Sequence, residues 1–263
     1  MDLKGKRVWI TGGSSGLGEA LAYAFAKKGA NLILTSRKRK ELDRVKANCS
    51  PDSQVHVEVL DMMEHDKIPV VAARLLKELG TIDIVINNAG ISQRGLAKDT
   101  ALEVDKRIMS INYFGVVALT KALLPSMLAN QSGHIVAVSS LVGKFGSPLR
   151  STYAASKHAL HGFFDSLRAE VVKDNIKVML ICPGYIHTNI SKNAVTGDGS
   201  AQNTMDEKTA AGLSPQEFAR QAVEAIQKGK QEVLIGKKET YGVLVKRLFP
   251  RLFAKILTRV KVT

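Results

Sequence analysis

The chain has 263 residues, of which 45% are hydrophobic, and it carries a formal net charge of +14. This length, without any linker rich in proline or serine, predicts a single domain with a large core and excludes a small scaffold held together by disulfides. Only two cysteines occur, Cys49 and Cys182, so we expect no disulfide, and the lack of a signal peptide or of an apolar run of ~20 residues leads us to expect a cytoplasmic protein.

Strands and helices alternate along most of the chain. Short apolar runs are followed by helical patterns, beginning with the strand at 8–10 and the helix at 17–28. This alternation is typical of an α/β fold, so we predict a single-domain Rossmann-type doubly wound parallel sheet of about seven strands with helices on both faces. Further strands are predicted at 31–35, 55–59, 82–86, 134–138, 177–181 and 231–235, and further helices at 38–48, 64–79, 101–130 (two helices), 153–173 and from 214 onward.

Residues 189–213 interrupt the alternation. They are rich in Asn, Ser, Thr and Gly and have no clear period, and so long an irregular segment in a compact domain typically forms a lid or a disordered loop. The pattern resumes with Ser214, Pro215 and Glu217, which suit the N-cap, first and third positions of a helix. We therefore predict a cofactor-binding and catalytic domain at 1–236, with a substrate lid at 189–213.

The remaining segment, 237–263, contains eight Lys or Arg residues against one Glu and so holds half of the net charge of +14. Apolar pairs recur every four residues from Leu244 to Val260 with cations between them, which predicts an amphipathic helix interrupted at Pro250. Two interpretations remain open: packing on its own domain or a subunit partner, or peripheral contact with an anionic membrane. We expect no nucleic-acid partner, because no recognition motif or interleaved aromatic residues accompany the charge.

The residues that follow the first strand predict a dinucleotide site. Gly12, Gly16 and Gly18 form a turn between a buried strand and a helix, where backbone N–H groups and the helix dipole can receive a pyrophosphate. The second strand ends at Ser36, Arg37 and Lys38 rather than at an acid that would accept from a ribose hydroxyl. Because two cations can pair with a 2′-phosphate, we predict NADP(H) as the cofactor. Arg39 and Lys40 are interpreted as solvated surface.

A second group of residues predicts acid–base chemistry. Tyr153 and Lys157 are four apart, so on a helix they share one face, and the ammonium is expected to lower the pKa of the phenol. Ser140 follows the predicted strand 134–138, which would deliver its hydroxyl to a substrate oxygen. His158 and His161 are expected on the outside of the helix, and no pairing of His or Cys indicates a metal site.

Taken together, these motifs resemble the short-chain dehydrogenase/reductase family over residues 5–235. The resemblance depends on the glycine turn at 11–18, Asp61, the Asn-Asn-Ala-Gly run at 87–90, Asn112, Ser140, Tyr153 with Lys157, and Pro183-Gly184, all in family order. The runs 139–144, 153–157 and 183–188 are most similar to the branch that contains 11β-hydroxysteroid dehydrogenase.

The resemblance implies a role for each matching position. Catalysis would use Ser140, Tyr153, Lys157 and Asn112, the last by holding a water that links Lys157 to solvent. It further implies a homo-oligomer, either dimer or tetramer. The implied cofactor contacts are Gly12, Ser14, Ser15, Gly16, Leu17 and Gly18 to the pyrophosphate, Arg37 and Lys38 to the 2′-phosphate, Asp61 and Met62 to adenine, Asn88, Ala89 and Gly90 to the ribose side, and Tyr153, Lys157, Ile186 and Thr188 to the nicotinamide half.

The expected activity is that of an NADP(H)-dependent oxidoreductase that moves a hydride between nicotinamide and a carbonyl or secondary alcohol of a lipophilic small molecule. Two alternatives stay open at this stage. One is a β-ketoacyl-thioester reductase, which would share every motif, and the other is a non-enzymatic NADP(H)-binding protein associated with a membrane.

Overall fold

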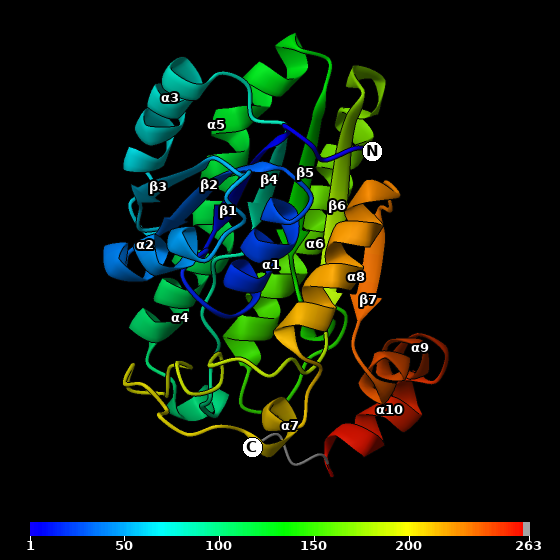
Figure 1. Cartoon of the computed structure of the whole chain (residues 1–263). Helices are drawn as coiled ribbons and strands as arrows, with labels where there is room; N and C mark the ends of the chain where they lie inside the picture. Colours follow the sequence, from blue (N-terminus) through cyan, green and yellow to red (C-terminus); the bar gives the residue numbers. More distant parts are fainter. Residues whose placement is uncertain (260–263) are drawn as a thin grey trace.

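The computed structural model describes residues 1–259, and within them seven parallel strands form one sheet in the order β3-β2-β1-β4-β5-β6-β7 (Figure 1). The predicted Rossmann-type sheet is therefore confirmed. The chain builds outward from β1 to β3, then returns to the other side of β1 at β4 and continues to β7. The strands are β1 Arg7–Thr11, β2 Asn31–Ser36, β3 Val55–Val59, β4 Ile84–Asn87, β5 Gly133–Val138, β6 Ile176–Pro183 and β7 Glu232–Ile235.

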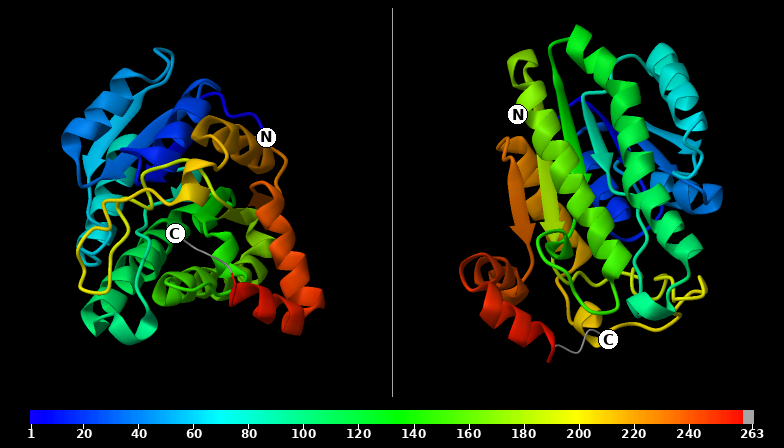
Figure 2. Two further views of the ribbon diagram at one scale, coloured as in Figure 1. Left: turned by 90° about the horizontal axis from the view of Figure 1, so that it is seen from below. Right: turned by 180° about the vertical axis from the view of Figure 1, so that it is seen from behind.

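Helices cover both faces of the sheet, because strands buried on both sides need an apolar layer on each. One apolar layer includes Phe25 of α1 and Phe218 of α8, and the other includes Leu75 of α3, Leu119 of α5 and Phe164 of α6. Figures 1 and 2 show these two layers from opposite sides. The bounds are α1 Gly16–Ala26, α2 Arg39–Ala47, α3 Lys67–Leu79, α4 Leu102–Met109, α5 Gly115–Ala129, α6 Ser151–Glu170 and α8 Pro215–Gln227.

A π-helical segment, Ser110–Phe114, joins α4 to α5, so that Leu102–Ala129 is one continuous helical run. By length and composition alone, this run could cross a bilayer, which the sequence interpretation had not recognised. Its buried residues, among them Ile108, Val116 and Leu123, instead pack in the cores of the domain. We therefore assign it as a core helix.

The lid segment 189–213 runs across the edge of the sheet where the strands end (Figure 2). It contains one short helix, α7 Glu207–Ala210, and is held to the domain by isolated bridges between Val195 and Gln93 and between Leu213 and Ile186. Ser214 then caps α8 as predicted, because its Oγ accepts from the backbone N–H of Glu217 at 3.2 Å.

The C-terminal extension forms two helices, α9 Tyr241–Leu248 and α10 Pro250–Leu257, beyond the end of β7 (Figure 1). The predicted interruption at Pro250 is confirmed, since this residue begins the second helix. Phe253 is buried, with its ring 4.9 Å from that of Phe145. Most of the predicted apolar stripe faces solvent, and its last member, Val260, lies outside the described residues.

Candidate active site

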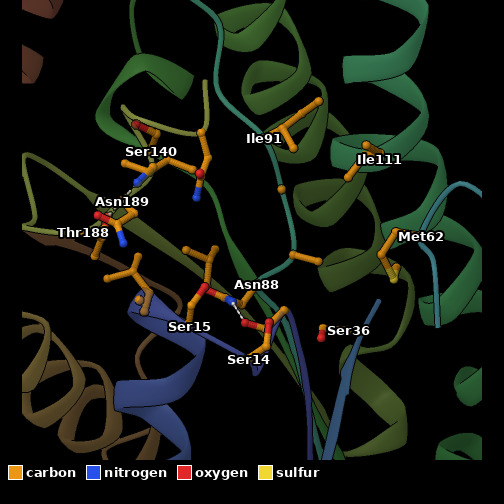
Figure 3. Close-up of a pocket in the computed structure, with 18 of the residues that line it drawn as sticks. Ser14, Ser15, Ser36, Met62, Asn88, Ile91, Ile111, Ser140, Thr188 and Asn189 are labelled. Atoms are coloured by element: carbon orange, nitrogen blue, oxygen red, sulfur yellow. Dashed lines mark hydrogen bonds between the residues drawn. The ribbon is translucent and has the colours of Figure 1, made fainter. Parts of the chain in front are cut away.

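A cavity of about 470 Å³ lies where the carboxyl ends of the strands meet. Ligands of open parallel sheets bind at this edge, next to the point where the strand order reverses. Here that point lies between β1 and β4. Figure 3 shows Ser36 and Met62 at one end of the cavity, Ser140, Thr188 and Asn189 at the other, and Ser14, Ser15 and Asn88 between them.

The glycine turn brings the N-terminus of α1 to the floor of the cavity. Gly12 and Gly16 have φ angles of +66° and +57°, which residues with a side chain rarely adopt. Gly18 does not line the cavity. A Cβ at Gly18 would lie 2.1 Å from the carbonyl oxygen of Gly12, so this glycine lets α1 approach the turn. The free N–H groups and the dipole of α1 suit a pyrophosphate.

The end of β4 is fastened to the same turn. The Asn88 side chain donates from Nδ2 to the carbonyl oxygen of Thr11 at 2.9 Å. Thr11 Oγ1 in turn accepts from the backbone N–H groups of Asn88 and Ala89, both at 3.0 Å. These bonds join the loop after β4 to the end of β1 beside the middle of the cavity. This cradle, with the turn below it, fits a dinucleotide.

The end of β2 supplies positive charge to the other wall. Arg37 and Lys38 line the cavity, and a guanidinium nitrogen of Arg37 lies 3.8 Å from a carboxylate oxygen of Asp61. Asp61, predicted to contact adenine, therefore also pairs with Arg37. Arg39 points elsewhere and forms an ion pair with Asp43 at 3.0 Å, consistent with its interpretation as surface.

The predicted catalytic side chains come from β5 and α6. Ser140 caps a short 3₁₀ turn after β5, with its Oγ accepting from Val142 N–H at 3.3 Å. The ammonium of Lys157 lies 5.8 Å from the centroid of the Tyr153 ring and donates to the carbonyl oxygen of Val138 at 2.8 Å. Ser140, Tyr153 and Lys157 therefore line one end of the cavity together.

The predicted electrostatics of Tyr153 need a correction. Burial raises the pKa of its phenol, while a hydrogen bond with Ser140 and the positive charges of Arg150 and Arg94 act against this rise. Burial also lowers the pKa of Lys157 to about 8. Burial thus raises the pKa of Tyr153, whereas the helical spacing of Tyr153 and Lys157 alone predicted that it would be lowered.

Asn112 lies in the π-helical segment and does not line the cavity. Its Oδ1 accepts from Ile91 N–H at 2.9 Å, and its Nδ2 donates to the carbonyl oxygen of Ile91 and to Ser156 Oγ at 2.9 and 3.0 Å. Both amide N–H donors are therefore used to hold the loop after β4 against α6. The predicted water remains a prediction.

The expected exposure of His161 is wrong, although His158 is exposed as expected. Because β5 and β6 end beside this turn of α6, His161 lies inside, with Nε2 3.0 Å from Ser139 Oγ and Nδ1 3.7 Å from Glu232. Burial lowers the pKa of His161 to about 4, as it also does for His134.

All of the other predicted cofactor and catalytic residues line this cavity. Sequence reasoning singled out no individual residue of a second set, which comes from the loop after β4, from the helical run of α4 and the π-helical segment, and from the predicted lid. None of these residues belongs to a motif, so no local pattern marks it as part of a site. The set includes Ile91, Arg107, Ile111, Asn189, Ile190, Asn193, Val195 and Ala201.

Comparison with known proteins gives a consistent result. Residues 6–199 match the short chain dehydrogenase family. A "Dehydrogenase/reductase SDR family protein 7-like" of Anopheles gambiae is 50% identical over 242 residues, which is 89% of this chain and 75% of that protein. The "Dehydrogenase/reductase SDR family member 7B" of Mus musculus is 46% identical over 261 residues, which is 97% and 81% of the two chains.

Among solved structures, a short-chain dehydrogenase from Streptomyces avermitilis superimposes with a TM-score of 0.82 at 29% sequence identity. The match covers 96% of this chain and 95% of that one. The particular resemblance to the 11β-hydroxysteroid dehydrogenase branch is not supported by these relatives, which carry other names.

The two buried histidines make stability depend on pH. Their pKa is about 4 in the folded chain against 6.5 for an ordinary histidine, so the unfolded chain binds more protons between these values. The free energy of unfolding should therefore fall as the pH falls through this window. We expect His161→Gln to flatten this slope, measured by urea unfolding at a series of pH values. His158→Gln, at an exposed position of the same helix, is the control, and an unchanged slope in His161→Gln would contradict the assignment.

Proposed function

The chain belongs to the short-chain dehydrogenase family, and we propose that within it this protein is an NADP(H)-dependent oxidoreductase that interconverts a carbonyl and a secondary alcohol of a lipophilic substrate. One observation carries the proposal. Ser140, Tyr153 and Lys157 line the same cavity as the phosphate-binding turn and the cationic end of β2. A complete set of catalytic groups also favours an enzyme over a protein that only binds the cofactor.

Each side chain then has a defined part in the reaction. A bound nicotinamide supplies or accepts the hydride. Ser140 donates a hydrogen bond to the substrate oxygen, and Tyr153 exchanges a proton with that oxygen. Lys157, held by the carbonyl oxygen of Val138, keeps a cation on the tyrosine face of α6. Asn112 holds the neighbouring loop at Ile91.

The preference for NADP(H) rests on charge at the end of β2. No acid occurs at Ser36, Arg37 or Lys38, and both cations line the cavity. A guanidinium can grip a phosphate through two N–H groups, whereas the 2′-hydroxyl of NAD(H) offers it no charge. The pairing with Asp61 lies at 3.8 Å, which is long enough for Arg37 to exchange it for a phosphate.

The substrate class follows from the apolar part of the cavity lining. Ile91, Ile190 and Val195 contribute to it, and the last two belong to the lid, whose Asn189 lies at the Ser140 end of the cavity (Figure 3). An apolar wall of this kind favours a lipophilic carbonyl compound. A β-ketoacyl thioester is the rival substrate, and a panel of both classes separates them.

The tail supports a further part of the proposal, that the protein is cytoplasmic and contacts membranes peripherally. The tail exposes large apolar side chains of a kind that is usually covered. They are Leu244 and Leu248 of α9, Phe249 between the two helices, and Leu252 and Ile256 of α10. Cations flank them, namely Lys246, Arg247, Arg251, Lys255 and Arg259. An apolar stripe with flanking cations suits an anionic lipid surface. We also expect a homo-oligomer, as the family resemblance implies.

The main experiment uses Tyr153→Phe, which keeps the ring and removes the transferable proton. Reduction of the accepted carbonyl with NADPH should fall roughly a hundred- to ten-thousandfold, while the NADPH Kd stays unchanged. Tyr23→Phe, whose hydroxyl bonds Glu19 away from the cavity, serves as the control. Turnover of Tyr153→Phe within tenfold of the parent would refute the proton-donor role.

Cofactor choice is tested with Arg37→Ala. Loss of a charge-assisted contact should raise the Kd of NADPH roughly ten- to a hundredfold and leave that of NADH nearly unchanged. Fluorescence titration measures both constants. Arg39→Ala removes a neighbouring arginine that pairs with Asp43 and should alter neither. An equal loss for both cofactors in Arg37→Ala would place this residue outside the ribose pocket.

Membrane contact is tested by sedimentation with anionic vesicles at several salt concentrations. The full chain should bind, and binding should weaken steeply with salt because each cation near the surface contributes ~1 kcal/mol. A chain ending at Gly242 should stay in the supernatant and keep its NADPH affinity. It retains Glu239, whose carboxylate accepts from Tyr185 N–H at 3.0 Å beside the cavity.

Full-length Leu248→Ser with Leu252→Ser separates the two contributions, because it keeps every cation and removes apolar area. Vesicle binding should then weaken at all salt concentrations. If the full chain does not sediment with vesicles, and the truncation instead changes the oligomer measured by light scattering, the stripe binds a second subunit and not a membrane.

A further inference from the structure

Three charged side chains are buried together outside the cavity lining. Arg94 follows β4, Arg150 precedes α6, and Asp206 belongs to the lid, and each is less than a tenth exposed. Nε of Arg94 donates to Asp206 Oδ2 at 3.1 Å, and Nη2 of Arg150 donates to the same oxygen at 3.2 Å. The cluster has a net charge of +1, and neither family motif nor proposed mechanism accounts for it.

Asp206 connects the cluster to the rest of the lid. Its Oδ1 accepts from Gln202 Nε2 at 2.9 Å, and its backbone N–H donates to Ser191 Oγ at 3.3 Å. Its carbonyl oxygen accepts from Ala210 N–H at 2.9 Å, which starts α7. Both ends of the lid are therefore bonded to the backbone of Asp206, whose carboxylate contacts Gln202 and the two arginines.

The arginines connect the cluster to the catalytic helix. Gln93, next to Arg94, accepts through Oε1 from the backbone N–H groups of Thr152 and Tyr153 at 2.9 and 3.2 Å. Arg150 is the residue before α6, and its carbonyl oxygen accepts from Ala154 N–H at 2.8 Å. The two guanidinium groups are thus held beside the turn of α6 that carries Tyr153.

A buried cluster of this kind is hard to explain by stability. Removing charges from water is costly, and well-packed apolar residues of similar volume often stabilise a fold as much or more. Hydrogen bonds from Arg94 and Gln202 with the two positive charges nevertheless outweigh burial and hold the pKa of Asp206 below its usual range, so the carboxylate stays charged. Its position between the lid and Tyr153 suggests a role in the reaction.

We propose that Asp206, clasped by Arg94 and Arg150, is a positioning residue that holds the lid over the substrate end of the cavity and balances the arginine charges beside Tyr153. The inference rests on the proposed function of Tyr153 and deepens it. Asp206 does not touch the substrate. It acts through the lid that carries Asn189, Ile190 and Val195, and through the field of the two arginines.

The sign of the field follows from the surrounding charges. Replacing Asp206 by Asn raises the local charge from +1 to +2 and should favour the phenolate of Tyr153, whereas Arg94→Gln lowers it to zero and should disfavour the phenolate. The charged and titratable groups that face Tyr153 and the cluster are Lys157 and Arg150 at α6, Arg94 after β4, Asp206 of the lid, Tyr185 after β6, and Asp105 and Arg107 of α4.

Limited trypsin cleavage tests the link to the lid without any substrate. The lid exposes Lys192 and Lys208, so a released lid should be cut there faster. We expect cleavage at least about tenfold faster in Asp206→Asn and in Arg94→Lys, which keeps the charge but loses the forked contact. Lys77 on α3 lies far from the lid and reports any global loosening.

Ultraviolet titration of tyrosinate tests the field. Subtracting the spectrum of the same variant with Tyr153→Phe isolates the one phenol, over the pH range in which circular dichroism shows a folded chain. Asp206→Asn should form phenolate at a lower pH than the parent by about half a unit or more. Arg94→Gln should form phenolate at a higher pH than the parent, and the double variant Asp206→Asn with Arg94→Gln should return toward the parent.

A purely structural cluster would loosen the lid in every variant without these opposite shifts. Unchanged cleavage in Asp206→Asn, or phenolate formation no earlier than in the parent, would overturn the proposal. Because neither measurement uses a substrate or NADPH, both can fail while the oxidoreductase assignment stands. Conversely, turnover by Tyr153→Phe would refute the proton-donor role of Tyr153 and leave the lid result intact.

Discussion

Parallel pairing of all seven strands is the constraint on which the rest of the structure depends. Parallel neighbours must be joined by crossovers, so the helices go to the two faces and every loop that follows a strand reaches the same edge. Because β1 pairs with both β2 and β4, the chain reverses its direction of growth beside the glycine turn. Hydrogen bonds from Asn88 to Thr11 join the loop after β4 to the end of β1 at this position. The predicted cofactor and catalytic residues, although distant in sequence, therefore meet in one cavity.

Burial decides the electrostatics of the reacting group. Burial raises the pKa of the Tyr153 phenol, although the ammonium of Lys157 lies 5.8 Å from the centroid of its ring. Burial likewise disfavours the charged form of Lys157 and lowers its pKa to about 8. The opposing influence comes from Ser140 and from two arginines that no motif identifies. A low dielectric strengthens both the attraction between opposite charges and the cost of removing a charge from water. The pKa of a buried group therefore depends on where each neighbouring charge lies.

Two segments lie outside the regular alternation of strands and helices, namely the lid at 189–213 and the tail that follows β7. The lid runs across the edge of the sheet where the strands end, and one of its residues, the buried Asp206, contacts Arg94 and Arg150. Beyond β7, the tail leaves an apolar stripe exposed while Phe253 alone is buried against Phe145. The lid contributes Asn189, Ile190 and Val195 to the lining of the cavity. The common chemistry and the individual substrate environment thus come from different parts of the chain.

Local patterns in the sequence were sufficient to predict the alternation of strands and helices, the glycine turn, the cap at Ser214 and the interruption at Pro250, because each depends on a few neighbouring residues. They also identified Ser140, Tyr153 and Lys157, since a family motif keeps those spacings. Only the tertiary structure buried His161, used the Asn112 amide to hold Ile91, and brought Arg94, Arg150 and Asp206 together. These outcomes depend on contacts between residues 21 to 112 positions apart and on their burial, which no local pattern records.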